Sequence, residues 1–288
     1  MAAYHSPYYA EVYDLGLART PWACDDAAIY LDAYKQMSSL RPRDPSHDYL
    51  VLDVGTGTGR VFRQIAEYMI QENISPAYNR FIGVDISPHM ISRAKEIVPK
   101  SLASRITYTV GSALDLQAIE GLQGPPKVDL LIFAYASISL LSEPGAAEKF
   151  LRQVVKVLRP GTGRAYIPIG YLFDDGRQSE ADKINQRYAD ASTRTDMPSK
   201  KYPNVFYRFP EGYMATRREG NIVKYAVPMQ VVEKGTGGQE RVIEAESPTT
   251  SVRMWGDGEF LLEAQMAGLQ LVEAKRTFNE TSYVFCVA

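Results

Sequence analysis

The sequence feature that most constrains the fold is an apolar strand that runs directly into a glycine-rich loop. Residues 50–54 read Leu-Val-Leu-Asp-Val, residues 55–60 read Gly-Thr-Gly-Thr-Gly-Arg, and a segment with helical spacing follows. This order places the backbone amides of a helix start over the end of a strand, which is where ligands bind in open α/β sheets. The G-x-G-x-G spacing does not match the dinucleotide pattern G-x-G-x-x-G, because Arg60 occupies the position of its last glycine.

Further strands are expected to join the first one in a parallel sheet. Short apolar runs at 80–85, 105–110 and 128–134 alternate with segments of helical pattern. Such alternation favours right-handed crossovers and a parallel sheet that helices cover on both faces. A helix at 146–158 ends at a Pro-Gly pair, and a fifth strand is expected at 163–169.

The second strand ends in a carboxylate, within Gly-Val-Asp-Ile-Ser-Pro at 83–88. At the same sheet edge as the glycine loop, Asp85 could accept hydrogen bonds from both hydroxyls of a ribose. The alternative is that Asp85 caps the helix beginning at Pro88, a role for which Ser87 is already well suited. The sequence therefore favours ribose binding by Asp85.

These two motifs resemble those of the class I S-adenosylmethionine-dependent methyltransferases. Residues 53–59 are similar to that family's D-x-G-x-G-x-G, and residues 85–90 to its D-x-S-x-x-M at the end of the next strand. The resemblance implies an α/β, Rossmann-like, seven-stranded sheet, mostly parallel with the last strand antiparallel and with helices on both faces. It also implies S-adenosyl-L-methionine as cofactor and S-adenosyl-L-homocysteine as product.

The resemblance implies the cofactor contacts as well. Gly55 and Gly57 would lie along the methionine portion, Asp85 would hold the ribose, and Ile86 and Met90 would enclose the adenine. The full set of expected contacts is Tyr13, Asp53, Gly55, Thr56, Gly57, Gly59, Asp85, Ile86, Met90, Ser112, Ala113, Phe133 and Ala134. Ser112 departs from the family, which often has an aspartate at this place; its hydroxyl is a weaker acceptor for the adenine amino group.

Candidate catalytic residues are Tyr135, Ser137 and Tyr13. The first two follow the fourth strand, which lies beside the methyl group in this family, although serines after a strand are also ordinary turn residues. Tyr13 belongs to a segment, 8–14, similar to an N-terminal element that closes over the cofactor in many small-molecule methyltransferases; simple packing is the alternative. Because the sequence offers no convincing His-Asp pair, we expect catalysis by positioning rather than by a strong base.

Composition excludes several classes of partner. The formal net charge is -2 and no run of five basic residues exists, so no nucleic-acid partner is expected. No apolar stretch approaches the roughly 20 residues of a membrane span, and no Cys/His cluster indicates a metal site. With two cysteines and no signal-peptide pattern at the start, a cytoplasmic location is expected.

The domain organisation predicted from these patterns has four parts. They are an N-terminal helical cap or lid (1–47), the S-adenosylmethionine-binding core (48–170), an inserted antiparallel β subdomain that covers the substrate (171–250), and the return of the core as a helix and a final β-hairpin (251–288). Within the insertion, a helical segment is expected at 180–192, and strands at 212–218, 222–233 and 239–246 are expected to form one antiparallel meander. Aromatic residues of the insertion form either a pocket roof or the subdomain's own core. Enzymes of this family often use such an insertion as a dimer surface, so a homodimer is an alternative to a monomer.

We expect the chain to transfer a methyl group to an oxygen, nitrogen or carbon nucleophile of a small organic acceptor, in secondary metabolism. The donor is already activated, so the protein mainly aligns the reacting atoms and excludes water. Because a fold does not settle a reaction, two alternatives stay open. One is a natural-product enzyme of the same fold that catalyses dehydration or pericyclic rearrangement, and the other is a non-catalytic regulatory protein.

Overall fold

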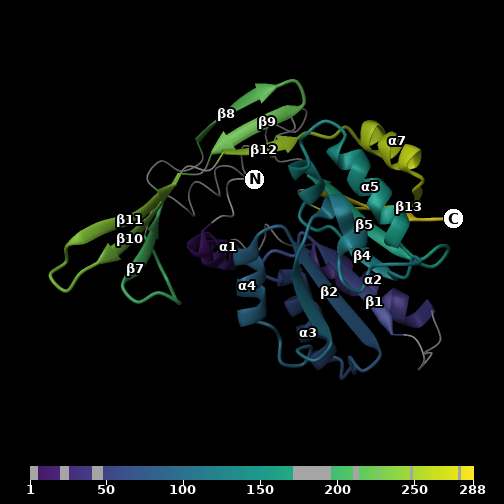
Figure 1. The fold of residues 1–288 in the computed structure, drawn as a ribbon, viewed down its shortest axis with the longest axis horizontal. Helices are drawn as coiled ribbons and strands as arrows, with labels where there is room; N and C mark the ends of the chain where they lie inside the picture. The colour runs from purple at the N-terminus through teal and green to yellow at the C-terminus, as the bar shows by residue number, and fades with distance from the viewer. Residues whose placement is uncertain are drawn as a thin grey trace. The chain divides into compact units, whose positions relative to one another are not determined.

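The computed structural model describes residues 6–19, 26–40, 48–170, 196–209, 214–226, 228–246, 249–277 and 280–288. The chain divides into two compact units. Residues 1–24 and 171–254 make up the first unit, and residues 25–170 and 255–288 make up the second. Figure 1 labels most of the elements of both units, which we describe one at a time.

The second unit is built on a seven-stranded sheet with the strand order β13-β14-β5-β4-β1-β2-β3. Its strands are β1 (Tyr49–Val54), β2 (Asn79–Asp85), β3 (Ile106–Val110), β4 (Leu130–Ile132), β5 (Arg164–Gly170), β13 (Gln270–Arg276) and β14 (Glu280–Cys286). β14 is antiparallel to both of its neighbours, whereas β3, β2, β1, β4 and β5 pair in parallel. This confirms the expected mixed sheet with an antiparallel last strand.

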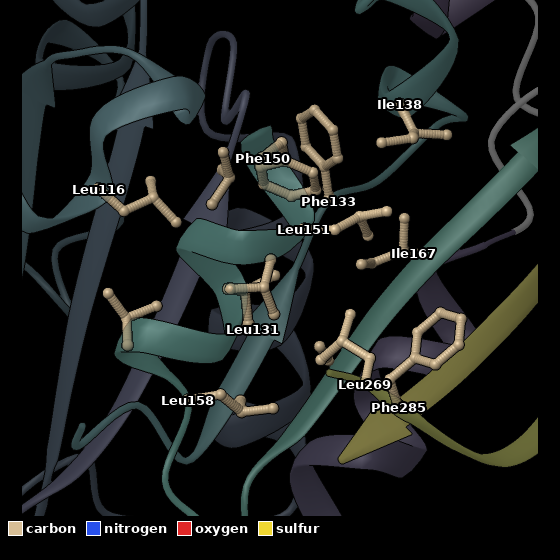
Figure 2. Close-up of a cluster of buried hydrophobic side chains, with 14 of the residues drawn as sticks. Leu116, Leu131, Phe133, Ile138, Phe150, Leu151, Leu158, Ile167, Leu269 and Phe285 are labelled. Atoms are coloured by element: carbon tan, nitrogen blue, oxygen red, sulfur yellow. The ribbon is translucent and has the colours of Figure 1, made fainter. Parts of the chain in front are cut away.

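Helices cover both faces of this sheet. They are α2 (Ala27–Leu40), α3 (Arg60–Gln71), α4 (Pro88–Glu96), α5 (Ala146–Val157) and α7 (Asp257–Ala267), with the short 3₁₀-helices η3 (Ala113–Ala118) and η4 (Ser137–Leu140). β1 is buried along its whole length because its side chains alternate between two apolar cores. Leu52 contributes to the core beneath α5 and α7, which Figure 2 shows in part, and Val51 to the core beneath α2, α3 and α4.

The first unit combines one helix with two small antiparallel sheets. The helix is α1 (Pro7–Arg19), and the sheets have the strand orders β11-β10-β7-β6 and β12-β9-β8. The strands are β6 (Met197–Pro198), β7 (Val205–Arg208), β8 (Met214–Glu219), β9 (Ile222–Ala226), β10 (Met229–Lys234), β11 (Glu240–Glu246) and β12 (Thr249–Arg253). No helix in the described ranges of either unit is long and apolar enough to cross a membrane.

The insertion differs in one respect from the single meander that the sequence suggested. The expected strand at 222–233 is two strands, β9 and β10, and they belong to different sheets. Pro228 lies between them, and proline has no N–H with which to continue a ladder of hydrogen bonds. The helical segment expected at 180–192 lies outside the described residues.

Candidate active site

The glycine loop makes a tight turn between β1 and α3. Gly55, Gly57 and Gly59 have φ angles of 65°, 55° and 80°, a left-handed region in which residues with a side chain are strained. At Gly59 there is also no room, since an added Cβ would lie 2.3 Å from the Tyr108 hydroxyl oxygen. The loop therefore presents bare backbone at the carboxyl end of β1, immediately before α3 begins at Arg60.

Asp85 braces this loop from the end of the neighbouring strand, β2. One carboxylate oxygen accepts the Gly57 amide at 2.9 Å, and the other accepts the Ser87 amide at 2.8 Å. Burial raises the pKa of Asp85, and the hydrogen bonds from Ser87 and Gly57 oppose that rise. A carboxylate has about four lone-pair sites, more than the backbone hydrogen bonds from Ser87, Gly57 and Ile86 occupy, so it can hold the loop and still accept a ligand hydroxyl.

Two exposed apolar side chains lie beside Asp85. Ile86 is 53% exposed and Val110, the last residue of β3, is 50% exposed. Val110 is the direct register partner of Asp85 across β2 and β3. An apolar surface next to a half-buried carboxylate suits a flat base joined to a ribose. Met90, which the sequence also assigned to the adenine, is a buried residue of α4 with an exposed fraction of 3%, and its contact with the adenine stays a prediction.

Ser112 and Ala113 lie just beyond β3. The Ser112 hydroxyl accepts the Leu114 amide at 3.1 Å and so caps the start of η3. The hydroxyl still has its own hydrogen and a second lone pair for a ligand. Ser112 therefore has a structural role whether or not it also contacts the adenine.

Asp53 is buried under the loop, with an exposed fraction of 1%. The Thr56 hydroxyl donates to its Oδ2 at 2.7 Å, so the Thr56 side chain is directed toward Asp53. No donor among the described residues reaches its Oδ1. Burial raises the pKa of Asp53 to about 7, against the lowering effects of the Thr56 hydrogen bond and the charge of Arg60.

A buried ion pair behind the loop was not found by sequence reasoning. Two guanidinium nitrogens of Arg60 donate to the two carboxylate oxygens of Asp26, at 2.6 and 2.8 Å. This bidentate geometry fixes both side chains. It joins the residue just before α2 to the first residue of α3, and it gives Arg60 a structural role at the position where dinucleotide-binding loops carry a glycine.

The chain makes a strained turn after β4. Tyr135 and Ala136 have φ angles of 56° and 48°, and two successive left-handed residues with side chains are unusual. The amide and the hydroxyl of Ser137 both donate to the carbonyl oxygen of Ala134, at 3.1 and 2.6 Å, and hold the turn closed. Strain of this kind tends to occur at functional sites.

The structure brings the glycine loop and this turn together. A Cβ added to Gly55 would lie 3.3 Å from the Phe133 ring and 3.6 Å from the Ser137 hydroxyl oxygen. Phe133 is itself buried against Phe150, with ring centroids 4.3 Å apart. Of the residues expected at the site, only Tyr13 belongs to the first unit, on α1.

Comparisons with known proteins agree with this geometry. A family model described as a methyltransferase domain matches residues 51–161. The N-methyltransferase FrzE of Cladobotryum sp is 29% identical over 284 residues, which cover 97% of this chain and 94% of FrzE. The probable methyltransferase ltbC of Aspergillus luteorubrus is 28% identical over 134 residues, or 45% of this chain and 42% of ltbC.

Solved structures share the fold at low sequence identity. DesVI of Streptomyces venezuelae has a TM-score of 0.60 at 16% identity, with 96% of each chain covered. The sugar N-methyltransferase KedS8 of Streptoalloteichus sp has a TM-score of 0.59 at 14% identity, with 96% of this chain and 93% of KedS8 covered. These matches show a methyltransferase domain over residues 51–161, and together with the hydrogen bond from Gly57 to Asp85 they support a class I S-adenosylmethionine-dependent methyltransferase.

Proposed function

We propose that this methyltransferase transfers the methyl group of S-adenosylmethionine to a nitrogen atom of a small organic acceptor. The single observation that carries methyl transfer is the Asp85 carboxylate hydrogen-bonded to the glycine loop beside exposed Ile86 and Val110. The nitrogen acceptor is supported by the relative similar over nearly the whole chain, whose name is N-methyltransferase. KedS8, which shares the fold, is described as a sugar N-methyltransferase.

The residues present fit the cofactor. Gly55 and Gly57 leave room for its methionine portion, and Asp85 can still accept a ribose hydroxyl. Ile86 and Val110 offer the apolar surface on which an adenine would lose contact with water. When bound, the cofactor supplies a methyl group on a positively charged sulfur, already activated toward an amine.

In this proposal the catalytic work of the chain is alignment. Tyr135 and Ser137 occupy a rigid turn that contacts Gly55, so they are suited to orient an acceptor nitrogen. The Ser137 hydroxyl is already donating to Ala134, which leaves its lone pairs free to accept an N–H of the acceptor. A neutral amine needs no base before attack, and its extra proton can leave to water after transfer. Tyr13 stays a predicted contact from the first unit.

The proposal is tested with methyl-labelled S-adenosylmethionine and a metabolite extract divided into basic, neutral and acidic fractions. We expect label to enter a product of the basic fraction, with S-adenosylhomocysteine formed in equal amount and the label located on nitrogen by mass spectrometry. The Asp85→Ala variant serves as the control that lacks the ribose contact. Label on oxygen or carbon, or conversion of an acceptor without any label, would contradict N-methylation.

A further inference from the structure

A buried carboxylate in the first unit, that of Glu11, is not among the residues assigned to the cofactor site. Glu11 of α1 is 1% exposed and accepts four hydrogen bonds from a segment nearly 190 positions along the chain. The Ser199 hydroxyl donates at 2.6 Å, the amides of Lys200 and Lys201 donate at 2.7 and 2.9 Å, and the Tyr207 hydroxyl donates to the same oxygen as Ser199.

This set of donors stabilises Glu11 as a carboxylate. Burial by itself would raise the pKa of Glu11, but the hydrogen bonds from Ser199, Tyr207 and the two amides outweigh burial and lower it. Hydrogen bonds to an ionised acceptor are about twice as strong as neutral ones. Removing the carboxylate would take the acceptor from the buried Tyr207 hydroxyl and from three part-buried donors, and leaving a buried donor without an acceptor costs more than the hydrogen bond itself contributes.

Apolar packing joins the same two segments. Val12, one residue after Glu11, lies in a core cluster with Val205, Tyr207 and Val231 of the four-stranded sheet. The Tyr8 ring packs edge-on against Tyr202, with ring centroids 4.8 Å apart. α1 therefore provides part of the hydrophobic core of the sheet β11-β10-β7-β6. The sheet would lack this part of its core without α1.

We propose that Glu11 is a positioning residue that fastens α1 to the inserted sheet, so that the tyrosines of α1 and the insertion recognise the acceptor as one folded unit. In this proposal Tyr13 of α1 serves the acceptor and not the cofactor, and α1 does not order over the cofactor by itself as a separate N-terminal lid would. The functional part of this inference rests on the proposed methyl transfer to a small acceptor. The structural part, the mutual dependence of α1 and the sheet, does not.

Hydrogen exchange of the full-length protein tests the structural part. In Glu11→Ala, amides in both 6–19 and 197–208 should lose protection by a similar factor, about 100-fold for a loss near 3 kcal/mol. Glu11→Gln keeps one acceptor oxygen and should lose less in the same two segments, so it decides the case if Glu11→Ala does not fold. The control is Glu233→Gln, which removes a carboxylate from the same sheet whose ion-pair partner, Arg241, lies outside both segments, so protection in 6–19 and 197–208 should be unchanged. Loss confined to 6–19 would overturn the proposal.

Calorimetry and turnover test the functional part. In Glu11→Gln, the affinity for S-adenosylhomocysteine should stay within about twofold, while label transfer to the basic extract fraction falls roughly tenfold or more. The decrease in label transfer should be largest at low extract concentration, because the substitution weakens binding of the acceptor. An equal loss of cofactor affinity would show that α1 serves the cofactor and would overturn the assignment. If the wild type transfers no label, the proposed function fails, whereas hydrogen exchange still decides whether Glu11 joins the two segments.

Discussion

Replacing Asp53 by asparagine should remove the decrease in the free energy of unfolding that ionisation of Asp53 causes in the wild type as the pH rises. The carboxylate is buried, one oxygen has no donor among the described residues, and burial raises its pKa from 3.8 to about 7. For a carboxyl group with a raised pKa, the contribution to stability is fully present below its unfolded pKa and is lost as the pH rises through the folded pKa. Asparagine has a similar shape and cannot ionise.

The magnitude follows from the size of the shift. One pKa unit corresponds to about 1.36 kcal/mol, so the ionisation of Asp53 should lower the free energy of unfolding by about 3 kcal/mol between pH 5 and pH 8. The asparagine carbonyl can still accept the Thr56 hydroxyl. Its amide adds a buried donor, which costs on the order of 1 to 3 kcal/mol at every pH. The prediction therefore concerns how the difference in free energy of unfolding between Asp53→Asn and the wild type changes with pH, and not the size of that difference at one pH.

The assay is urea denaturation at pH 5 and pH 8, followed by the fluorescence of Trp255 in a Trp22→Phe background. Trp255 is buried in the second unit against Phe260, so it reports on the unit that contains Asp53. The matched control is Val54→Ala, a non-ionising change at the next buried position of β1, whose effect should be equal at both pH values. A difference between Asp53→Asn and the wild type that stays constant from pH 5 to pH 8 would refute the reasoning.

Three further predictions concern the glycine loop and the turn after β4. Gly59→Ala should lower the free energy of unfolding by roughly 2 to 3 kcal/mol in urea denaturation, because of its positive φ and the Tyr108 hydroxyl; a neutral effect would contradict the packing. Ala136→Gly should raise the free energy of unfolding by about 1 kcal/mol by relieving left-handed strain, and no gain would mean the turn is unstrained. Tyr135→Phe and Ser137→Ala should each slow label transfer about 10- to 100-fold with unchanged S-adenosylhomocysteine affinity. A loss of more than a thousandfold in either variant would indicate an essential acid or base.

The sheet and the glycine loop could be predicted because their signals are local. Strands and helices alternate along residues 49–170, and the turn that needs left-handed backbone is written as three glycines in five positions. The position of the Asp85 carboxylate beside the glycine loop could also be predicted, because parallel strands bring their carboxyl ends to one edge of the sheet.

Other parts of the site depend on contacts that no local pattern encodes. Val110 looks like any apolar strand residue until the register of β2 and β3 places it beside Asp85. The partners of Glu11 lie 188 or more positions away, so α1 could be expected as a helix but not as part of the insertion's core. The division of 222–233 at Pro228 had a local signal, the proline itself, which the apolar pattern around it obscured.

The most direct test of the cofactor site is titration calorimetry with S-adenosylhomocysteine on the wild type and on Asp85→Ala. The account predicts a micromolar Kd for the wild type and a loss of about 30- to 150-fold in the variant, which corresponds to 2 to 3 kcal/mol for the ribose hydrogen bonds. Asp85→Ala also loses the hydrogen bond from the Gly57 amide. Asp85→Asn keeps one acceptor oxygen, so its affinity for S-adenosylhomocysteine should lie between those of the wild type and Asp85→Ala. Equal affinity in the wild type and Asp85→Ala, or no binding by the wild type, would contradict the assignment of this site.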